Sequence, residues 1–204
     1  MIGAFHALAR EHGIALILDE TYRDFRGADG PAHGLFRDPD WRDTLVQLYS
    51  FSKVYSLAGY RVGAIACGQP MMESVEKIVD CVAICAPRIG QEAALFGVQH
   101  LGRWREERRQ IIAEKLATLR RAFRTNDPGY ELVSAGAYFA YLRHPFAGET
   151  ATEVARRLAD RENLLCVPGS MFGPGQESYL RFAFANLDAG LIPELAQRLA
   201  SSRG

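Results

Sequence analysis

Lys53 lies in a segment whose residue types and spacing could carry out chemistry, with hydroxyl groups before it and an arginine after it. The segment reads Ser50-Phe51-Ser52-Lys53-Val54-Tyr55-Ser56-Leu57-Ala58-Gly59-Tyr60-Arg61-Val62-Gly63. An amine in this setting can form a Schiff base with an aldehyde. Hydroxyl groups and a guanidinium can bind a phosphate, because arginine makes paired hydrogen bonds to its oxygens. The other two lysines, Lys77 and Lys115, fall in amphipathic helical patterns, where lysine is normally a surface residue.

Two further segments carry polar residues at positions where a ligand could bind. Asp19 ends the apolar run Ile14–Asp19, and Tyr22 follows three residues later. Ligands of α/β sheets bind beyond the carboxyl ends of the strands, so Asp19 is a candidate site residue. Taken alone, it is more often a helix N-cap or a loop residue. Arg181 lies in the strand-like run Tyr179–Phe184, where an arginine is either an outward-facing surface residue or an anion ligand.

Taken in this order, the three segments resemble the signature segments of the class I/II aminotransferases, the pyridoxal-phosphate (PLP) enzymes of fold type I. The lysine segment matches the family's Ser-x-Ser-Lys followed by Leu-Ala-Gly-x-Arg-x-Gly, and residues 19–22 match its Asp-Glu-x-Tyr pattern. Arg181 follows Lys53 by 181 − 53 = 128 residues, close to the family's interval. Two further matches are the loop 168–173, of the form Pro-Gly-x-x-Phe-Gly, and the strand entry 136–139, of the form Gly-Ala-x-Phe.

The resemblance implies three catalytic residues, Lys53, Asp19 and Tyr22. Lys53 would hold PLP as a Schiff base and move a proton from the substrate Cα, and Asp19 would keep the pyridine nitrogen protonated. Tyr22 would donate a hydrogen bond to the ring oxygen of the cofactor. Arg181 would bind the substrate α-carboxylate through paired hydrogen bonds. The cofactor-binding residues that the resemblance implies are Asp19, Tyr22, Ser50, Ser52, Lys53 and Arg61.

The expected reaction is the transfer of an amino group from an amino acid to a 2-oxo acid through PLP bound to Lys53. The same motifs serve other PLP enzymes of this fold type, such as C–S lyases, decarboxylases and synthases. The resemblance covers only the C-terminal half of the family, so the chain looks N-terminally truncated. An inactive fragment that needs the missing half is therefore a further alternative. Because full-length members are dimers, a homodimer is expected, and the amino-acid substrate stays open.

Composition argues against several other classes of function. The 204 residues carry 24 Lys and Arg against 24 Asp and Glu, and this zero net charge argues against nucleic acid or an anionic membrane as a partner. The four cysteines form no CxxC pair, which is typical of a reduced, cytoplasmic setting. The histidines are scattered, so no metal site is expected. No signal-peptide pattern opens the chain, and the aliphatic run Ile14–Leu18 is too short to span a bilayer.

The apolar pattern predicts an α/β part followed by a small α+β domain. The resemblance implies that the α/β part is the C-terminal part of the PLP-transferase large domain, with a parallel or mixed sheet and helices. The stop signal Asn126-Asp127-Pro128-Gly129 places the boundary near residue 125, giving domains 1–125 and 126–204. Because most strands of the family's central sheet lie outside the part that the resemblance covers, the first domain should leave one face and one edge of a three-stranded sheet uncovered. Strand 14–19 reads as buried on both faces. We expect a loop at 27–39, helices at 1–12, 70–83, 91–124 with a break near Gly102, 152–160 and 191–200, and strands at 14–19, 44–50, 61–67, 130–133, 138–143, 163–167 and 178–184.

Overall fold

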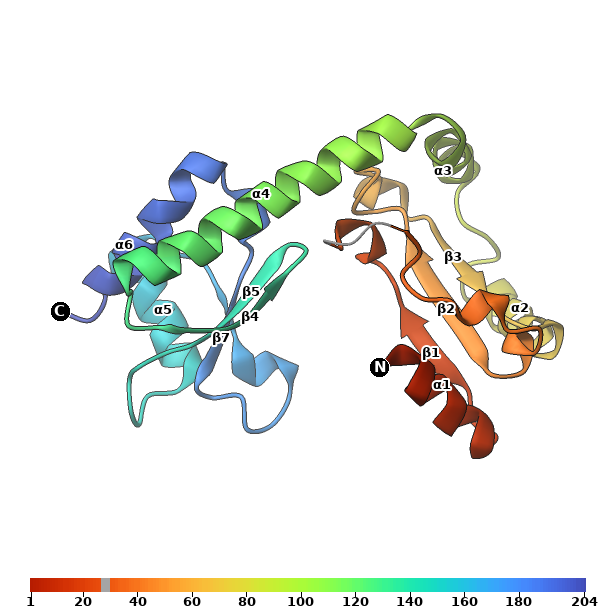
Figure 1. Ribbon diagram of the computed structural model, residues 1–204, viewed down its shortest axis with the longest axis horizontal. Helices are drawn as coiled ribbons and strands as arrows, with labels where there is room; N and C mark the ends of the chain where they lie inside the picture. Colours follow the sequence, from red (N-terminus) through yellow and green to blue (C-terminus); the bar gives the residue numbers. More distant parts are fainter. Residues whose placement is uncertain (27–29) are drawn as a thin grey trace. The chain divides into compact units, whose positions relative to one another are not determined.

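The computed structural model describes residues 1–26 and 30–204 (Figure 1). They form two compact units, Met1–Arg109 and Gln110–Gly204, each with its own sheet. The division falls within one long helix, α4 (Gly102–Asn126). The boundary expected near residue 125 lies at the end of the same helix, so the assignment of domains 1–125 and 126–204 stays a prediction.

Unit 1 is built on a mixed three-stranded sheet, as expected, in the order β1–β2–β3. β1 and β2 are parallel, whereas β2 and β3 are antiparallel. Asp19 is paired with Leu48, and Ser50 is paired with Gly63. Paired residues point to the same face of a sheet, and so do residues two apart in one strand. Asp19 and Ser50 therefore share one face, because Leu48 lies two residues before Ser50. The strands are β1 (Leu16–Asp19), β2 (Leu45–Ser50) and β3 (Gly63–Ala66).

Three helices and the start of α4 complete unit 1. They are α1 (Ile2–Glu11), α2 (Gln69–Val82) and α3 (Arg88–His100). Pro70 stands in the first turn of α2, where a missing N–H leaves no hydrogen bond unmade. Pro87 occupies the N-cap position of α3, so this helix begins three residues before the expected start at 91. The break expected near Gly102 lies at Leu101, between α3 and α4.

The segment between β1 and β2 is irregular. It contains short 3-10 turns at Arg23–Phe25, Leu35–Arg37 and Trp41–Asp43. The expected loop at 27–39 is described from residue 30 onward, and residues 27–29 lie outside the described part of the chain.

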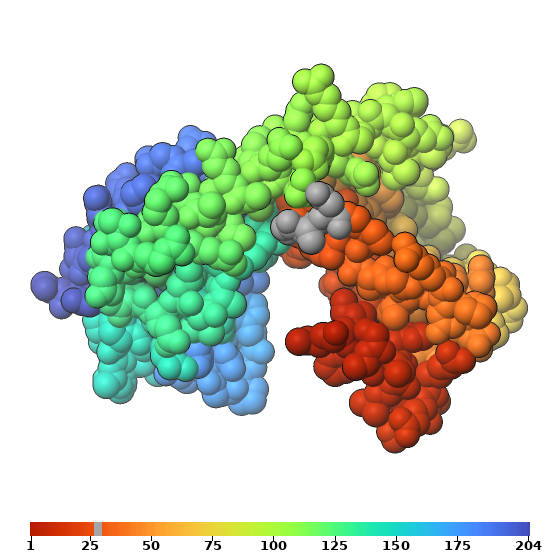
Figure 2. Space-filling view, viewed as in Figure 1, coloured from red at the N-terminus to blue at the C-terminus, as the bar shows by residue number. Residues whose placement is uncertain are grey.

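Unit 1 exposes much apolar surface. The prediction that strand 14–19 is buried on both faces is wrong, because Ile17 of β1 is 61% exposed while Leu16 and Leu18 are half-buried. Only one face of this strand is covered by the described residues. Helix α1, dark red in Figure 2, also exposes Phe5 and Leu8. Further exposed apolar residues of unit 1 are Ile65, Ile78, Val82, Ile84, Ile89, Leu95, Phe96 and Val98.

Unit 2 is an antiparallel four-stranded sheet in the order β4–β5–β7–β6, packed with two helices of its own and with the C-terminal part of α4. Its core includes Leu142, Leu180 and Phe182 from the sheet together with Leu158 and Leu199 from the helices. A capping box formed by the residues before and within the first turn starts α5. The elements are β4 (Glu131–Gly136), β5 (Phe139–Arg143), α5 (Ala151–Glu162), β6 (Val167–Pro168), β7 (Tyr179–Phe182) and α6 (Ile192–Ser201).

One strand of unit 2 is much shorter than predicted. Residues 163–167 are expected to form a strand, but only Val167 and Pro168 pair with β7. Asn163 instead ends α5 in the left-handed conformation, with φ +53°, and Leu164 N–H still donates to the Leu158 carbonyl. Asparagine tolerates this conformation at helix ends better than other non-glycine residues. None of the described helices combines the length and the apolarity needed to cross a bilayer.

Candidate active site

Asp19 and Ser50 lie at the same end of the unit 1 sheet. Asp19 is the last residue of β1 and Ser50 the last residue of β2, and these two strands are parallel. Their side chains point to the same face because Asp19 is paired with Leu48, two residues before Ser50. The carboxyl ends of parallel strands are where α/β sheets bind ligands. The fold therefore brings two predicted site residues to a suitable edge.

The chain after Asp19 holds this carboxylate in its charged form. The backbone N–H of Thr21 donates to Asp19 Oδ1 over 3.0 Å. Hydrogen bonds from the side chain and then the backbone of Thr21 lower the pKa of Asp19, and the small degree of burial opposes this only weakly. An exposed carboxylate that stays ionised can pair with a protonated ring nitrogen.

Glu20, which directly follows Asp19, is buried and binds several neighbouring side chains. It is 9% exposed and accepts hydrogen bonds from Gln47 Nε2 and, over 3.2 Å, from Arg23 Nη1. His33 Nε2 lies 3.3 Å from its other oxygen. Two of these partners lie in the irregular segment and the third lies in β2, so the Glu20 carboxylate links that segment to the sheet.

Lys53 is held by a loop whose next two residues are anchored in unit 1. Val54 and Tyr55 are 1% and 6% exposed. Trp104 Nε1 donates to the Val54 carbonyl over 2.9 Å. Tyr55 packs so closely on α3 that a Cβ at Gly97 would lie 2.8 Å from its Cδ1. The lysine loop is therefore fixed by α3 and α4 through residues adjacent to Lys53.

The structure also brings Lys53 to Tyr22. Lys53 Nζ lies 5.6 Å from the centroid of the Tyr22 ring. Tyr22 directly precedes the 3-10 turn that follows β1, while Lys53 follows β2. An ammonium at this distance from an aromatic ring is attracted to its face.

The predicted phosphate ligands converge at the end of β2. Ser52 N–H donates to Ser50 Oγ over 3.2 Å, so the two hydroxyl-bearing residues are adjacent in space. The pairing of β2 with β3 continues past the strand ends, since Phe51 N–H donates to the Val62 carbonyl over 3.3 Å. This brings Arg61, the neighbour of Val62, to the same end of the sheet.

The conformation of Arg61 is unusual. Its backbone is left-handed, with φ +53°, and its exposed side chain uses one donor to bind the Ala58 carbonyl over 2.7 Å. A guanidinium carries five donors, so others stay open to an anion. Gly63 is required beside it, because a Cβ there would lie 2.8 Å from the Tyr49 carbonyl oxygen, whereas a Cβ at Gly59 would meet nothing within 4 Å.

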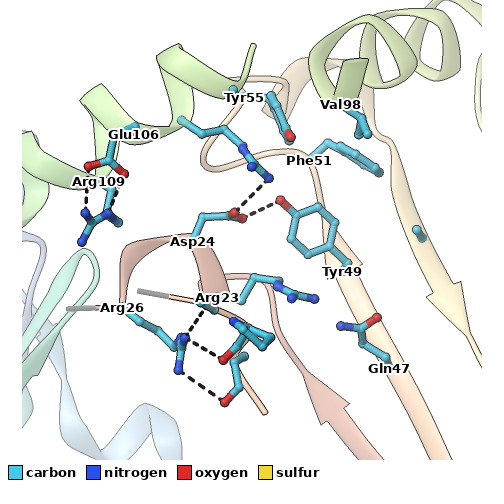
Figure 3. A pocket seen from close by; sticks show the side chains of 16 residues that line it. Arg23, Asp24, Arg26, Gln47, Tyr49, Phe51, Tyr55, Val98, Glu106 and Arg109 are labelled. Atoms are coloured by element: carbon cyan, nitrogen blue, oxygen red, sulfur yellow. Dashed lines mark hydrogen bonds and ion pairs between the residues drawn. The ribbon is translucent and has the colours of Figure 1, made fainter. Parts of the chain in front are cut away.

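A cavity of about 550 Å³ in unit 1 lies on the opposite face of the sheet (Figure 3). It is lined by Gln47 and Tyr49, whose side chains alternate with that of Ser50 along β2, and no residue predicted for the site lines it. Tyr49 donates to Asp24 Oδ2 over 2.6 Å, and burial, followed by this hydrogen bond, raises the pKa of Tyr49. Arg105 lies 3.7 Å from the other oxygen of Asp24. We therefore place the candidate site at the strand ends.

The predicted substrate ligand, Arg181, lies in unit 2 on β7. Its Cζ lies 4.3 Å from the centroid of the Phe139 ring and 4.7 Å from that of Phe172. Arg181 and Phe139 also line a mostly apolar cavity of about 440 Å³ in this unit. The side chain is partly exposed, so the guanidinium is accessible to an anion.

Sequence reasoning missed the residues that anchor the lysine loop. Trp104 lies in the charge run 103–109, which reads as a solvated helix face, yet its indole is partly buried and binds the loop. The sequence did contain a signal for this contact. Trp104 is the one uncharged residue among six charged ones in the run, and a large aromatic side chain is not expected on a fully solvated helix face. Thr21, which lowers the pKa of Asp19, was likewise not singled out.

Comparisons with known proteins identify the family of this chain. The sequence model of the aminotransferase class I and II family matches residues 3–199. The aromatic aminotransferase ISS1 of Arabidopsis thaliana is 30% identical and the putative aminotransferase YugH of Bacillus subtilis 27% identical, over 96% and 87% of this chain. The chain spans about half the length of these relatives, 48% and 45%.

Solved structures give the same result. The α-aminoadipate aminotransferase LysN of Thermus thermophilus, complexed with N-(5'-phosphopyridoxyl)-L-leucine, is 25% identical and superposes with a TM-score of 0.85 over 98% of this chain and 52% of its own. The aromatic aminotransferase of Pyrococcus horikoshii, 22% identical, shares the fold with a TM-score of 0.85 over 98% of this chain and 54% of its own. The chain belongs to the class I and II aminotransferase family.

Proposed function

We propose that this chain carries the lysine, the ring-nitrogen ligand and the phosphate ligands of a PLP-dependent aminotransferase that moves an amino group from an amino acid to a 2-oxo acid. The observation that carries the proposal is the convergence of Asp19, Ser50, Ser52 and Arg61 at one end of the unit 1 sheet. Family membership supports the reaction type, as does the phosphopyridoxyl ligand of the Thermus relative.

The residues present fit PLP. The lowered pKa of Asp19 supports a permanent carboxylate that would pair with the protonated pyridine nitrogen. Two hydroxyl groups, from Ser50 and Ser52, and the open donors of Arg61 suit a dianionic phosphate. When bound, PLP supplies a ring that accepts the electrons released as the substrate Cα loses its proton.

The chemical steps that fall to the chain concern protons and orientation. Lys53 would be the covalent attachment point and, once displaced by the substrate amine, would carry the proton away from the substrate Cα. Tyr22, whose ring lies beside the Lys53 amine, would donate a hydrogen bond to the ring oxygen of the cofactor. Arg181 would bind the substrate α-carboxylate and so fix the Cα–H bond in a reactive orientation.

We further propose a cytoplasmic homodimer that acts in amino-acid metabolism, possessing an active site to which both subunits contribute. The resemblance to the dimeric members of the family supports this assembly. The exposed apolar residues of unit 1, among them Ile17 and Phe5, are consistent with a surface that another polypeptide covers.

The test is product analysis with the purified chain, PLP, an amino-acid donor and a 2-oxo acid acceptor. Transamination yields the new amino acid and the new 2-oxo acid in equal amounts, and Lys53→Ala should abolish both products, while Lys77→Ala on α2 should not. A lyase or decarboxylase would break the equality of the two products. Normal turnover by Lys53→Ala would refute the proposal.

A second candidate is that the chain works only together with a further polypeptide. The specific observation that favours it is that the chain spans 45–48% of its relatives while unit 1 exposes the apolar face of β1. The same assay would then give products only after addition of the separately expressed part of a relative that lies before the matched region. Equal activity with and without that addition would argue against this candidate.

A further inference from the structure

The guanidinium of Arg181 contacts two aromatic rings that come from two different segments of unit 2. Phe139 opens β5, and Phe172 ends the 3-10 turn Gly169–Phe172 between β6 and β7. Both ring centroids lie within 5 Å of the Arg181 Cζ, at 4.3 and 4.7 Å. Aromatic faces attract a guanidinium electrostatically without occupying its N–H donors.

The register of the sheet explains this arrangement. Arg181 is paired with Tyr141, two residues after Phe139, so Phe139 and Arg181 project from the same face of the sheet. This is the face turned away from the core, since the neighbouring Leu142 and Leu180 are fully buried among the helices. The same face therefore carries a cluster of aromatic side chains around one cation.

A second arginine on this face shows what Arg181 lacks. Arg143 lies 3.1 Å from Glu131 and donates to the Tyr179 hydroxyl over 2.7 Å. Among the residues that the structure describes, Arg181 has neither an acidic partner nor a hydrogen-bond acceptor. Its position is set by rings alone, and its donors are left for a ligand.

We propose that Phe139 and Phe172 are positioning residues that hold the guanidinium of Arg181 ready for a carboxylate. An unrestrained arginine side chain samples many rotamers and loses that freedom when it binds. Rings that restrict it in advance remove part of this cost, and their apolar surroundings strengthen the paired hydrogen bonds to the carboxylate. The identification of that carboxylate with the substrate's rests on the proposed function.

The two ring contacts set the size of the expected effect on carboxylate binding. Loss of one ring is expected to weaken carboxylate binding about 2- to 5-fold, and loss of both about 5- to 30-fold. The effect belongs to binding, so in an active enzyme KM should rise while kcat changes little.

The experiment uses NMR of arginine Nε–H groups in the full chain, titrated with pyruvate as the carboxylate probe and with methyl pyruvate as the uncharged control. Phe172→Leu and Phe139→Leu should each move the Arg181 signal, because ring-current shifts are lost, and raise the Kd for pyruvate by the factors above. Phe172→Tyr keeps the ring and should keep the affinity. Phe146→Leu is the matched control, since that ring contacts Arg157 at 4.0 Å instead.

Two results would overturn the proposal: an unchanged Kd in the double leucine variant of a folded protein, or pyruvate binding that persists in Arg181→Gln. Repeating the titration in Lys53→Ala separates this inference from the proposed reaction. Arg181 should still respond to pyruvate there even though transamination is abolished. Failure of transamination in the wild-type chain, both alone and with the added part of a relative, together with an intact, ring-dependent pyruvate response would refute the proposed function alone.

Discussion

Gly97→Ala should disturb the loop that carries Lys53 without touching any residue of the candidate site. A Cβ at this position would lie 2.8 Å from Tyr55 Cδ1 and 3.1 Å from Cε1. Tyr55 is 6% exposed, so its ring has little room to move away. Overpacking of this kind costs about 1–3 kcal/mol, against which alanine gains up to ~1 kcal/mol in helix propensity.

Gly3→Ala supplies the matched control. Gly3 also lies in a helix, α1, but a Cβ there would meet nothing within 4 Å. Both variants gain helix propensity from the same Gly-to-Ala change. The difference between their free energies of unfolding therefore approximates the steric cost at position 97. Unit 1 of Gly97→Ala should therefore be less stable than that of Gly3→Ala by about 1–3 kcal/mol.

Urea unfolding followed by tryptophan fluorescence measures this difference. The chain has two tryptophans, Trp41 and Trp104, and both belong to unit 1. Because Trp104 binds the lysine loop directly, its emission should also change in the folded state of Gly97→Ala. Equal stability and equal emission in the two variants would refute the reasoning that α3 positions Lys53 through Tyr55.

Three further predictions concern titration, reactivity and the core. Thr21→Val should raise the pKa of Asp19, measured by carboxyl NMR, because the side-chain hydrogen bond from Thr21 is the main cause of the lowered pKa. Ionised Asp19 contributes stability that is present above the ordinary pKa of an aspartate and is lost as the pH falls through the lowered pKa. This contribution should be smaller in the variant. Burial raises the pKa of Cys166 to about 12, so at pH 8 a thiol reagent should modify the exposed Cys81 well before Cys166, and simultaneous labelling would contradict the burial. Leu142→Ala, at a fully buried position, should destabilise unit 2 by about 2–5 kcal/mol in urea unfolding followed by circular dichroism, and a loss below about 1 kcal/mol would argue against that core.

Most elements of the fold could be predicted because their signals are local. Apolar periodicity and capping residues place the helices within a few residues, and the break at Leu101 was expected from the glycine beside it. What periodicity cannot show is whether another layer covers a strand. The run 14–19 is apolar throughout, yet Ile17 is exposed, since burial depends on neighbours elsewhere in space. Asn163 is a residue type that often ends a helix, but the apolar residues after it led to the prediction of a strand at 163–167.

The candidate site likewise combines features that a local motif predicts with contacts that no local pattern predicts. The motif predicts that Ser50, Ser52 and Arg61 act together, and the antiparallel pairing of β2 with β3 provides the physical reason. The anchors of Lys53 lie on helices about fifty residues further along, so no local pattern links them to the loop. The same holds for Phe139, which reaches Arg181 through the register of two strands.

The most direct test of Lys53 as the attachment point is a titration of the full chain with PLP, followed by visible absorption. The chain has three lysines, so borohydride reduction and peptide mapping can assign the modified one without ambiguity. We predict an absorption band distinct from that of free PLP in the wild type and in Lys77→Ala, its loss in Lys53→Ala, and the label on Lys53. A band that survives in Lys53→Ala, or a label distributed over Lys77 and Lys115, would contradict the assignment of the site.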